Sequence, residues 1–208
     1  MFPLASPRII VQGSKQKRVF DLVFATLVVL FLLSWLLPLI ALLIKLDSKG
    51  PILFKQLRTG KNGKPFYCLK FRSMRLSADA HHKQASRGDS RITKVGAFLR
   101  KTSLDELPQF INVLKGEMSV IGPRPHMLRH TEDYSKLIHH FMARHTILPG
   151  ITGLAQVSGY RGETKETEAM VKRVEADLKY IQSWSFGLDL KIVGQTVVQA
   201  LRPQEHVF

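Results

Sequence analysis

Two adjacent carboxylates, Asp105 and Glu106, are the residues of this 208-residue sequence best suited to chemistry. One carboxylate can attack as a nucleophile while its acidic neighbour helps to hold a divalent cation. Apolar residues follow at helical spacing from Leu107 to Leu114, and Ser103 with Glu106 forms a capping-box pattern. The alternative is that the acidic pair only begins a helix. Both interpretations predict a helix N-terminus here, which also suits an anionic phosphate.

Basic residues elsewhere in the sequence could surround this acidic pair. In Gly122-Pro123-Arg124-Pro125 the prolines restrict the backbone, so a rigid loop presents one guanidinium. A planar fork that donates two hydrogen bonds suits a phosphate; the alternative is a rigid turn with a solvated arginine. Lys70 and Arg72 lie at the end of an expected strand, and Arg100 precedes the acidic pair. Together these four cations predict one anionic site.

A glycine-rich turn, Pro149-Gly150-Ile151-Thr152-Gly153, could approach a ligand closely. We therefore expect Gly153 and the nearby Gln156 to contribute to the substrate site. The sequence contains neither a Walker P-loop nor a GxGxxG motif, and its paired histidines lack zinc-ligand spacing. Its single cysteine, Cys68, cannot form an internal disulfide.

The basic charge of the chain is concentrated in one region. Lys and Arg number 31 and Asp and Glu 16, which leaves a formal net charge of +15. The excess lies in the first half, above all in residues 55–101, whereas residues 102–208 are balanced. Such a balance indicates an anionic partner: nucleic acid, anionic lipid or a phosphorylated substrate. No recognised nucleic-acid motif is present, so we expect no nucleic-acid partner.

A 23-residue apolar segment, Leu22 to Ile44, lacks charged residues and is long enough to cross a membrane. It is too long for a signal peptide and has no small-residue cleavage site after it. Basic residues on both flanks favour a cytoplasmic location for both ends. Pro38 removes a helical hydrogen bond and clashes with the carbonyl of Ser34, whose hydroxyl could satisfy part of the freed backbone. A re-entrant helix broken at Pro38 and an ordinary kinked span both remain open.

The remaining elements predict a small, mostly helical α/β domain. Gly60-Lys61-Asn62-Gly63 indicates a hairpin turn between strands at 52–54 and 66–71. Periodicity predicts helices over 93–101, over 170–181 and, as an amphipathic helix suited to packing or to a membrane surface, over 188–201. We divide the chain into a basic N-terminus with a membrane helix, residues 1–48, and a membrane-associated catalytic domain, residues 49–208.

The ordered motifs resemble the bacterial sugar transferase family, the monotopic phosphoglycosyl transferases. The resemblance extends roughly from Lys15 to Val198. The matching pieces are Lys17-Arg18-Val19-Phe20-Asp21, Gly50-Pro51-Ile52-Leu53-Phe54-Lys55-Gln56, Lys70-Phe71-Arg72-Ser73-Met74, Leu99-Arg100, Ser103-Leu104-Asp105-Glu106-Leu107-Pro108-Gln109, Gly122-Pro123-Arg124-Pro125 and Pro149-Gly150-Ile151-Thr152-Gly153.

The resemblance implies transfer of a sugar-1-phosphate from a UDP-sugar to undecaprenyl phosphate, with release of UMP. It implies that Asp105 is the nucleophile of a covalent phosphosugar intermediate and that Glu106 assists with Mg²⁺. It also places Lys70, Arg72, Arg100 and Arg124 around the phosphates. The stretch 157–164 resembles the branch that begins exopolysaccharides with glucose-1-phosphate, although Leu154 stands where tryptophan is frequent in the family.

The resemblance further implies a helix that breaks at the proline and re-enters, at the cytoplasmic face of the bacterial inner membrane. Anionic membrane lipid is an expected partner, and a homo-oligomer is compatible with the sequence. UDP-glucose is the expected donor; UDP-galactose and a UDP-N-acetyl-hexosamine are the alternatives. Two competing classes remain: a basic membrane-binding or nucleic-acid-binding module without catalysis, and an enzyme that acts by direct in-line transfer.

Overall fold

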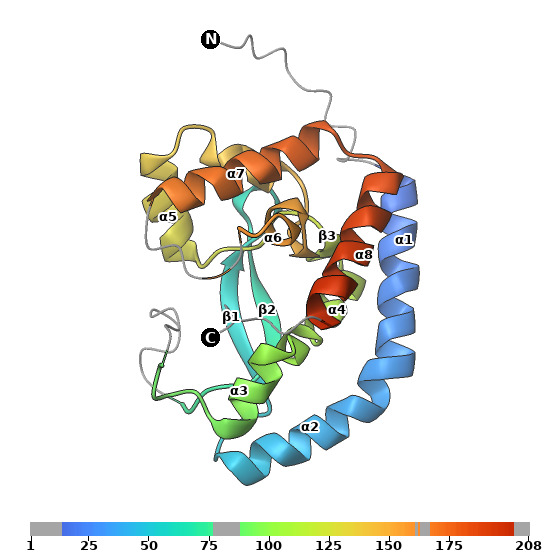
Figure 1. Ribbon diagram of the computed structural model, residues 1–208, viewed down its shortest axis with the longest axis vertical. Helices are drawn as coiled ribbons and strands as arrows, with labels where there is room; N and C mark the ends of the chain where they lie inside the picture. Colours follow the sequence, from blue (N-terminus) through green and yellow to red (C-terminus); the bar gives the residue numbers. More distant parts are fainter. Residues whose placement is uncertain (1–13, 77–87, 161, 163–166, 202–208) are drawn as a thin grey trace.

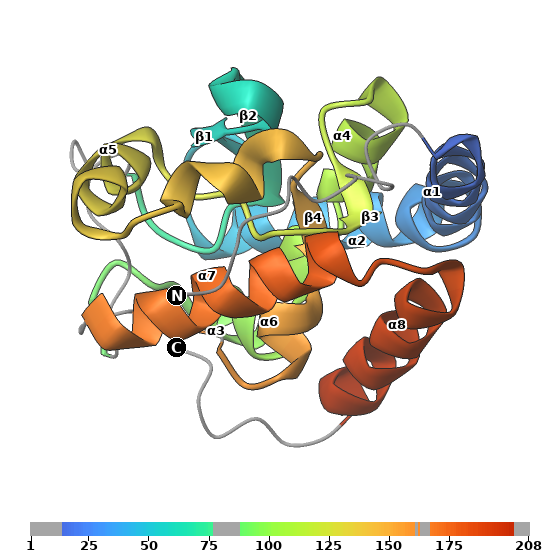
Figure 2. The same cartoon turned by 90° about the horizontal axis from the view of Figure 1, so that it is seen from above.

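The computed structural model describes residues 14–76, 88–160, 162 and 167–201. A long bent N-terminal helix runs along one side of a mostly helical domain that contains a β-hairpin (Figure 1). The predicted fold class is therefore confirmed. Figure 2 shows α7, Thr167–Gln182, and α8, Phe186–Leu201, on one side of the short strands β3, Ser119–Ile121, and β4, Gly150–Thr152, with the hairpin on the other.

The N-terminal helix bends at a turn of π-helix. Helix α1, Lys15–Val28, continues through the π segment Val29–Leu33 into α2, Ser34–Asp47, and the two halves meet at an angle (Figure 1). The prediction of a break at Pro38 was wrong in position, because Pro38 lies inside α2. A proline disturbs the turn that precedes it, so the irregular segment lies on its N-terminal side.

Two side chains donate hydrogen bonds to backbone carbonyls within this bend. The Ser34 hydroxyl donates to the Leu30 carbonyl at 2.6 Å, and the Trp35 indole donates to the Phe31 carbonyl at 2.9 Å. Ser34 therefore has the backbone-satisfying role expected of it, although at a different carbonyl from the one opposite Pro38.

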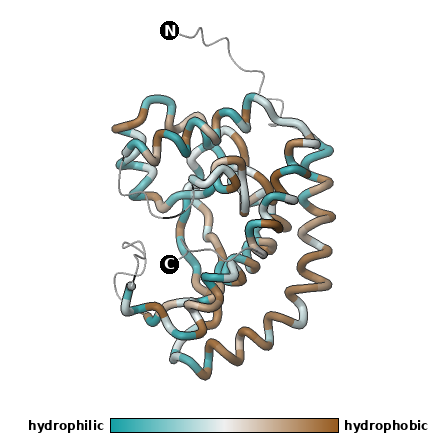
Figure 3. The backbone as a smooth tube through the Cα atoms, viewed as in Figure 1, coloured by the Kyte–Doolittle hydropathy of each residue, from teal (hydrophilic) through white to brown (hydrophobic). Residues whose placement is uncertain are grey.

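One stripe of the bent helix packs on the domain and the rest is exposed. Ala25, Leu33, Ile40 and Ile44 are each at most 2% exposed, whereas Phe31 is 73% exposed. Apolar residues continue along both halves of the helix (Figure 3). Among the described residues, Lys15–Asp47 is the one helix long and apolar enough to cross a membrane by length and composition.

The hairpin pairs β1, Leu53–Thr59, antiparallel with β2, Pro65–Phe71, around the expected turn. The first strand is longer than predicted. Asn62 at φ 55° and Gly63 at φ 76° supply the left-handed backbone that the turn requires. Buried Phe66 and Cys68 fix the inner face of β2, which directs Lys70 to the same side.

Helix α3, Lys94–Lys101, precedes the acidic pair in the chain. Thr93 caps this helix by accepting a hydrogen bond from the Gly96 N–H at 3.0 Å. A 3₁₀ turn, Leu104–Glu106, follows, and then α4, Gln109–Lys115. The predicted capping box is wrong: Ser103 has φ 57° and its side chain makes no cap hydrogen bond. Pro108 instead takes the position before α4, where its missing N–H costs nothing.

A parallel strand pair that the sequence did not predict joins β3, Ser119–Ile121, to β4, Gly150–Thr152. Their connection contains α5, Leu128–Leu137, and a 3₁₀ segment, Phe141–Thr146. The short helix α6, Leu154–Val157, follows β4. The strands approach so closely that a Cβ on Gly150 would lie 2.1 Å from the Gly122 nitrogen.

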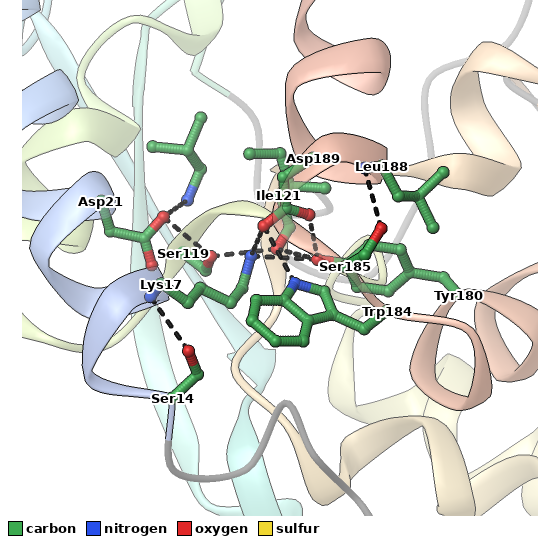
Figure 4. A network of polar contacts seen from close by, with 11 residues as sticks. Ser14, Lys17, Asp21, Ser119, Ile121, Tyr180, Trp184, Ser185, Leu188 and Asp189 are labelled. Atoms are coloured by element: carbon green, nitrogen blue, oxygen red, sulfur yellow. Dashed lines mark hydrogen bonds and ion pairs between the residues drawn. The ribbon is translucent and has the colours of Figure 1, made fainter.

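Helices α7, Thr167–Gln182, and α8, Phe186–Leu201, complete the domain and match the predicted periodicity. Figure 4 shows the buried network that joins them to α1. Lys17 Nζ contacts Asp189 Oδ2 at 2.9 Å and donates to the Tyr180 hydroxyl at 2.9 Å. That hydroxyl donates to Asp189 Oδ1 at 2.7 Å, and the Trp184 indole donates to Oδ2 at 3.0 Å. The start of the bent helix is thus tied to the C-terminal helices.

Candidate active site

Asp105 and Glu106 lie together on the 3₁₀ turn before α4, and both are largely buried. Asp105 is 7% exposed and Glu106 9%. The turn packs against β2 and against the end of α3, so the two carboxylates face residues from separate parts of the chain. The structure thus places the acidic pair before a helix, as predicted, but on a separate tight turn that precedes α4.

Glu106 is held by two of the predicted cations. Arg124 forms a two-pronged contact with it, from Nη2 to Oε1 at 2.6 Å and from Nη1 to Oε2 at 3.1 Å. Lys70 Nζ donates to the same Oε1 at 2.7 Å. Burial opposes ionisation of Glu106, but these two charges outweigh burial and hold the Glu106 pKa well below its usual range. Glu106 is therefore a fixed anion between Lys70 and Arg124.

Asp105 has a different environment, although it is the next residue. Its nearest ion-pair contact joins Oδ2 to Lys70 Nζ at 3.9 Å. Burial raises the pKa of Asp105; Lys70 opposes that rise, and the charge of Glu106 adds to it. Arg100 is a further charge that lowers the Asp105 pKa, which agrees with its predicted place beside the pair. Adjacent carboxylates with pKa values displaced in opposite directions are typical of a site with divided roles.

Backbone contacts anchor the loop that presents Arg124. The Gly150 N–H donates to the Pro123 carbonyl at 2.9 Å, and the Thr59 N–H donates to the His126 carbonyl at 2.9 Å. Glu106 raises the pKa of Arg124 further, so its guanidinium stays charged. The structure therefore brings Lys70, Arg100 and Arg124 to the acidic pair, as the sequence predicted.

Arg72 does not join them. It is 3% exposed, and its guanidinium donates to the carbonyls that end α2: Ile44 at 3.4 Å, Ser48 at 2.6 Å and Lys49 at 2.5 Å. The structure gives Arg72 these acceptors rather than the acidic pair, because the C-terminal end of α2 supplies unpaired carbonyls at that position. Gly50, at φ 127°, leaves room for the guanidinium; a Cβ there would lie 1.9 Å from Arg72 Nη1.

Gly153 and Gln156 also have structural explanations. A Cβ on Gly153 would lie 2.2 Å from the Gly122 carbonyl oxygen, so this glycine permits the close approach of two loops. Gln156 is 7% exposed and donates to the Ile151 carbonyl at 3.1 Å. Neither contacts the acidic pair through an interaction seen in the described residues. The expected branch motif at 157–164 lies in part outside those residues, at 161 and 163–164.

Arg58 also contacts the Arg124 loop, which the sequence did not predict. Its guanidinium donates to the Pro125 carbonyl at 3.2 Å and to Gln56 Oε1 at 2.6 Å. Burial lowers the pKa of Arg58 to about 10, and the neighbouring charges of Arg124 and Glu106 act on it in opposite senses. The basic excess of residues 55–101 was the available signal, but nothing in that signal distinguished Arg58 from its neighbours.

The acidic pair offers few oxygens to a metal ion. Within the described ranges, no group of three His, Cys, Asp or Glu side chains could hold one. Arg124 and Lys70 both contact Glu106 Oε1, but only Arg124 of these two contacts Oε2. Oε2 therefore retains the capacity to accept another contact beside the Asp105 carboxylate. Mg²⁺ commonly takes one or two protein carboxylates and completes its shell with phosphate and water, and these residues fit that pattern.

Comparison with known proteins supports the family resemblance. The model of the bacterial sugar transferase family matches residues 12–203. UDP-glucose:undecaprenyl-phosphate glucose-1-phosphate transferase of Escherichia coli strain K12 is 56% identical over 182 residues, which are 87% of this chain and 39% of that protein. The protein of the same name from Caulobacter vibrioides is 51% identical over 187 residues, 89% of this chain and 70% of that protein.

A third relative carries the name of a different sugar. UDP-N-acetylgalactosamine-undecaprenyl-phosphate N-acetylgalactosaminephosphotransferase of Aeromonas hydrophila is 43% identical over 177 residues, 84% of this chain and 41% of that protein. This chain thus spans well under half the length of two of these relatives. Because the family model covers almost all of it, this chain belongs to the bacterial sugar transferase family.

Proposed function

We propose that this protein transfers a hexose-1-phosphate from a UDP-sugar, UDP-glucose in the first instance, to undecaprenyl phosphate and releases UMP. The observation that carries the proposal is the buried Asp105 carboxylate beside Glu106, which Lys70 and Arg124 hold as a fixed anion. Support also comes from the names of the relatives in Escherichia coli and Caulobacter vibrioides. We assign the product to the first step of exopolysaccharide synthesis.

The reaction proceeds in two displacements at one phosphorus atom. A carboxylate oxygen of Asp105 attacks the phosphorus that bears the sugar, and an O–P bond forms as the bond from that phosphorus to the bridging oxygen breaks. UMP leaves with the electron pair of the broken bond. An oxygen of undecaprenyl phosphate then attacks the same phosphorus, and Asp105 departs as a carboxylate. The product is a sugar linked to undecaprenyl diphosphate.

The surrounding charges suit these displacements. Lys70, 21% exposed, and Arg124, 28% exposed, lie at the accessible edge of the acidic pair, where phosphate oxygens would arrive. Their charges favour ionised Asp105 and would also offset charge on the transferring phosphoryl group. We propose that Asp105 and Glu106 hold Mg²⁺ together with the phosphates; when bound, this ion would further neutralise the phosphoryl charge.

We propose that the bent helix enters the membrane and leaves by the cytoplasmic face of the bacterial inner membrane. Lys17 and Arg18 face inward: Lys17 pairs with Asp189, and Arg18 donates to the carbonyls of Val113 and Leu114. Exposed Lys15, before the apolar segment, and Lys45 and Lys49, at its end, remain to contact anionic headgroups. Such a shallow insertion puts the site where a lipid acceptor and an aqueous nucleotide sugar can meet.

The decisive experiment measures UMP release by the purified protein with undecaprenyl phosphate and a panel of UDP-sugars. UMP release with UDP-glucose is the expected result, and no release with any donor would support the non-catalytic membrane-binding module. UDP-N-acetylgalactosamine belongs in the panel because the Aeromonas hydrophila relative is named for that sugar. UDP-galactose and UDP-N-acetylglucosamine complete it.

A further inference from the structure

A buried ion pair lies behind the Arg124 loop, and the proposed mechanism does not use it. Arg144, from the 3₁₀ segment Phe141–Thr146, is 1% exposed, and Asp177, from α7, is 2% exposed. Arg144 Nη2 and Asp177 Oδ2 are 2.5 Å apart. We infer that Arg144 is a positioning residue, which sets the orientation of Arg124 against Glu106. This inference rests on the proposed function.

The contacts of Arg144 converge on the Arg124 loop. Its Nη2 donates to the carbonyl oxygen of Arg124 itself at 2.9 Å. Its Nη1 lies 2.8 Å from Nδ1 of His126, two residues further along the same loop. Burial and the charge of Arg144 hold the His126 pKa well below its usual range, so the neutral ring can accept from the guanidinium. Asp177 in turn holds the guanidinium from the side of α7.

Arg124 is therefore fixed at both ends. Its main-chain carbonyl accepts from Arg144, and its guanidinium forks onto both oxygens of Glu106. The prolines on either side restrict rotation of the intervening backbone. A shift of the Arg124 carbonyl would therefore be transmitted to the two contacts between its guanidinium and Glu106. A misplacement of about 1 Å can cost about 100-fold in rate.

Stability alone is a weak reason for such a pair. Two buried charges lose their hydration, and a well-packed apolar pair of similar volume is often as stable or more stable. The bond to the Arg124 carbonyl, in contrast, requires a donor with the reach of a guanidinium. A positioning role predicts that the functional effect of Arg144 depends on the presence of the Arg124 side chain, which a purely structural role does not.

A double-mutant cycle tests this dependence. The four proteins are wild type, Arg144→Gln, Arg124→Ala and the double variant, and the measured quantity is kcat/KM for UMP release from UDP-glucose. We expect Arg144→Gln to lower kcat/KM at least 30-fold in the wild-type background. In the Arg124→Ala background, the same change should cost less than threefold. An equal fold-loss in both backgrounds would overturn the inference.

Another buried ion pair, Lys17–Asp189, supplies a matched control. The hydroxyl of Tyr180 bonds to the Lys17–Asp189 pair, away from the Arg124 loop. Tyr180→Phe should lower the melting temperature. Its effect on kcat/KM should be the same fold-change in the wild-type and Arg124→Ala backgrounds. The combined variant Arg144→Met with Asp177→Leu should melt within a few degrees of wild type yet stay impaired. Recovery of wild-type kcat/KM by this apolar pair would contradict a positioning role.

Hydrogen–deuterium exchange separates this inference from the proposed function. If the wild-type protein releases no UMP, the proposed function fails, but the tie between Arg144 and the loop can still be measured. Arg144→Gln should accelerate exchange in peptides covering 122–127 at least tenfold and leave the second hairpin strand, 65–71, unchanged. Unchanged exchange in 122–127 would show that Arg144 does not hold the loop.

Discussion

Arg124 reaches across to Glu106 with both terminal nitrogens, at 2.6 and 3.1 Å, and so holds one acid of the pair by a contact that its neighbour Asp105 does not share. Lys70 adds a third bond to Glu106 at 2.7 Å but stays 3.9 Å from Asp105. Two residues adjacent in sequence thereby acquire different environments. Glu106 is a fixed anion between Lys70 and Arg124, and Asp105 is the proposed nucleophile.

Replacing Arg124 by lysine keeps the positive charge but removes the two-pronged contact with Glu106, so it tests the importance of that contact. An ammonium cannot make two parallel bonds to Glu106, so we expect Arg124→Lys to lower kcat/KM at least tenfold. UMP release measures the effect. Lys64→Ala, which removes an exposed cation from the hairpin turn, is the control and should stay within twofold of wild type. Full activity of Arg124→Lys would exclude a role for the fork.

Asp105→Asn should preserve the fold and abolish the covalent route. Asparagine has nearly the same size but lacks the nucleophilic carboxylate, and loss of such a group typically costs orders of magnitude in rate. Wild type incubated with labelled UDP-glucose and no lipid acceptor should retain label after denaturation and release one UMP per site. The variant should do neither. Near wild-type turnover by Asp105→Asn would leave the residue with a structural role only.

The pH dependence of the first step should reflect the raised pKa of Asp105. Only the ionised carboxylate attacks, so the rate should fall as the pH drops through that pKa, at a pH above the 3.8 of an ordinary aspartate. Lys70→Met removes the charge that most strongly lowers the Asp105 pKa, so the acid limb of the rate profile should move to higher pH. The comparison uses single-turnover rates from pH 4 to 8. An unmoved limb would show that another group titrates.

Arg72→Ala should affect stability much more than chemistry. The change removes three bonds from a charged donor to the carbonyls at the end of α2, which we expect to cost about 2–4 kcal/mol of unfolding free energy. Thermal melting in detergent measures the loss. The rate of label transfer to Asp105 in the folded fraction should stay within threefold of wild type. A large rate defect with an unchanged melt would return Arg72 to the phosphate site.

Cysteine labelling in intact cells should show the topology of the bent helix. Single cysteines at positions 12 and 48 should both be protected from an impermeant reagent added outside, while the buried native Cys68 stays unlabelled. Pro38→Ala restores a backbone donor, so the π segment can close and some molecules should then span the membrane. External labelling at position 12 in the unmodified helix would rule out re-entry.

The amino-acid sequence determined the local elements and the family. Apolar periodicity predicted the helices at the C-terminal end, glycine and asparagine predicted the hairpin turn, and the ordered motifs identified Asp105 and Glu106. These features could be predicted because apolar periodicity, turn residues and the order of motifs depend on residues that are close in the sequence.

Tertiary structure decided which polar residues meet. Lys70 and Arg72 lie two residues apart, yet Lys70 donates to Glu106 whereas Arg72 donates to a carbonyl at the C-terminal end of α2. The parallel pair β3–β4 and the contact of Arg144 with the Arg124 carbonyl join segments about 20 to 30 residues apart. A buried cation must pair with whatever acceptor the fold brings near it, and the sequence around the cation does not specify that acceptor.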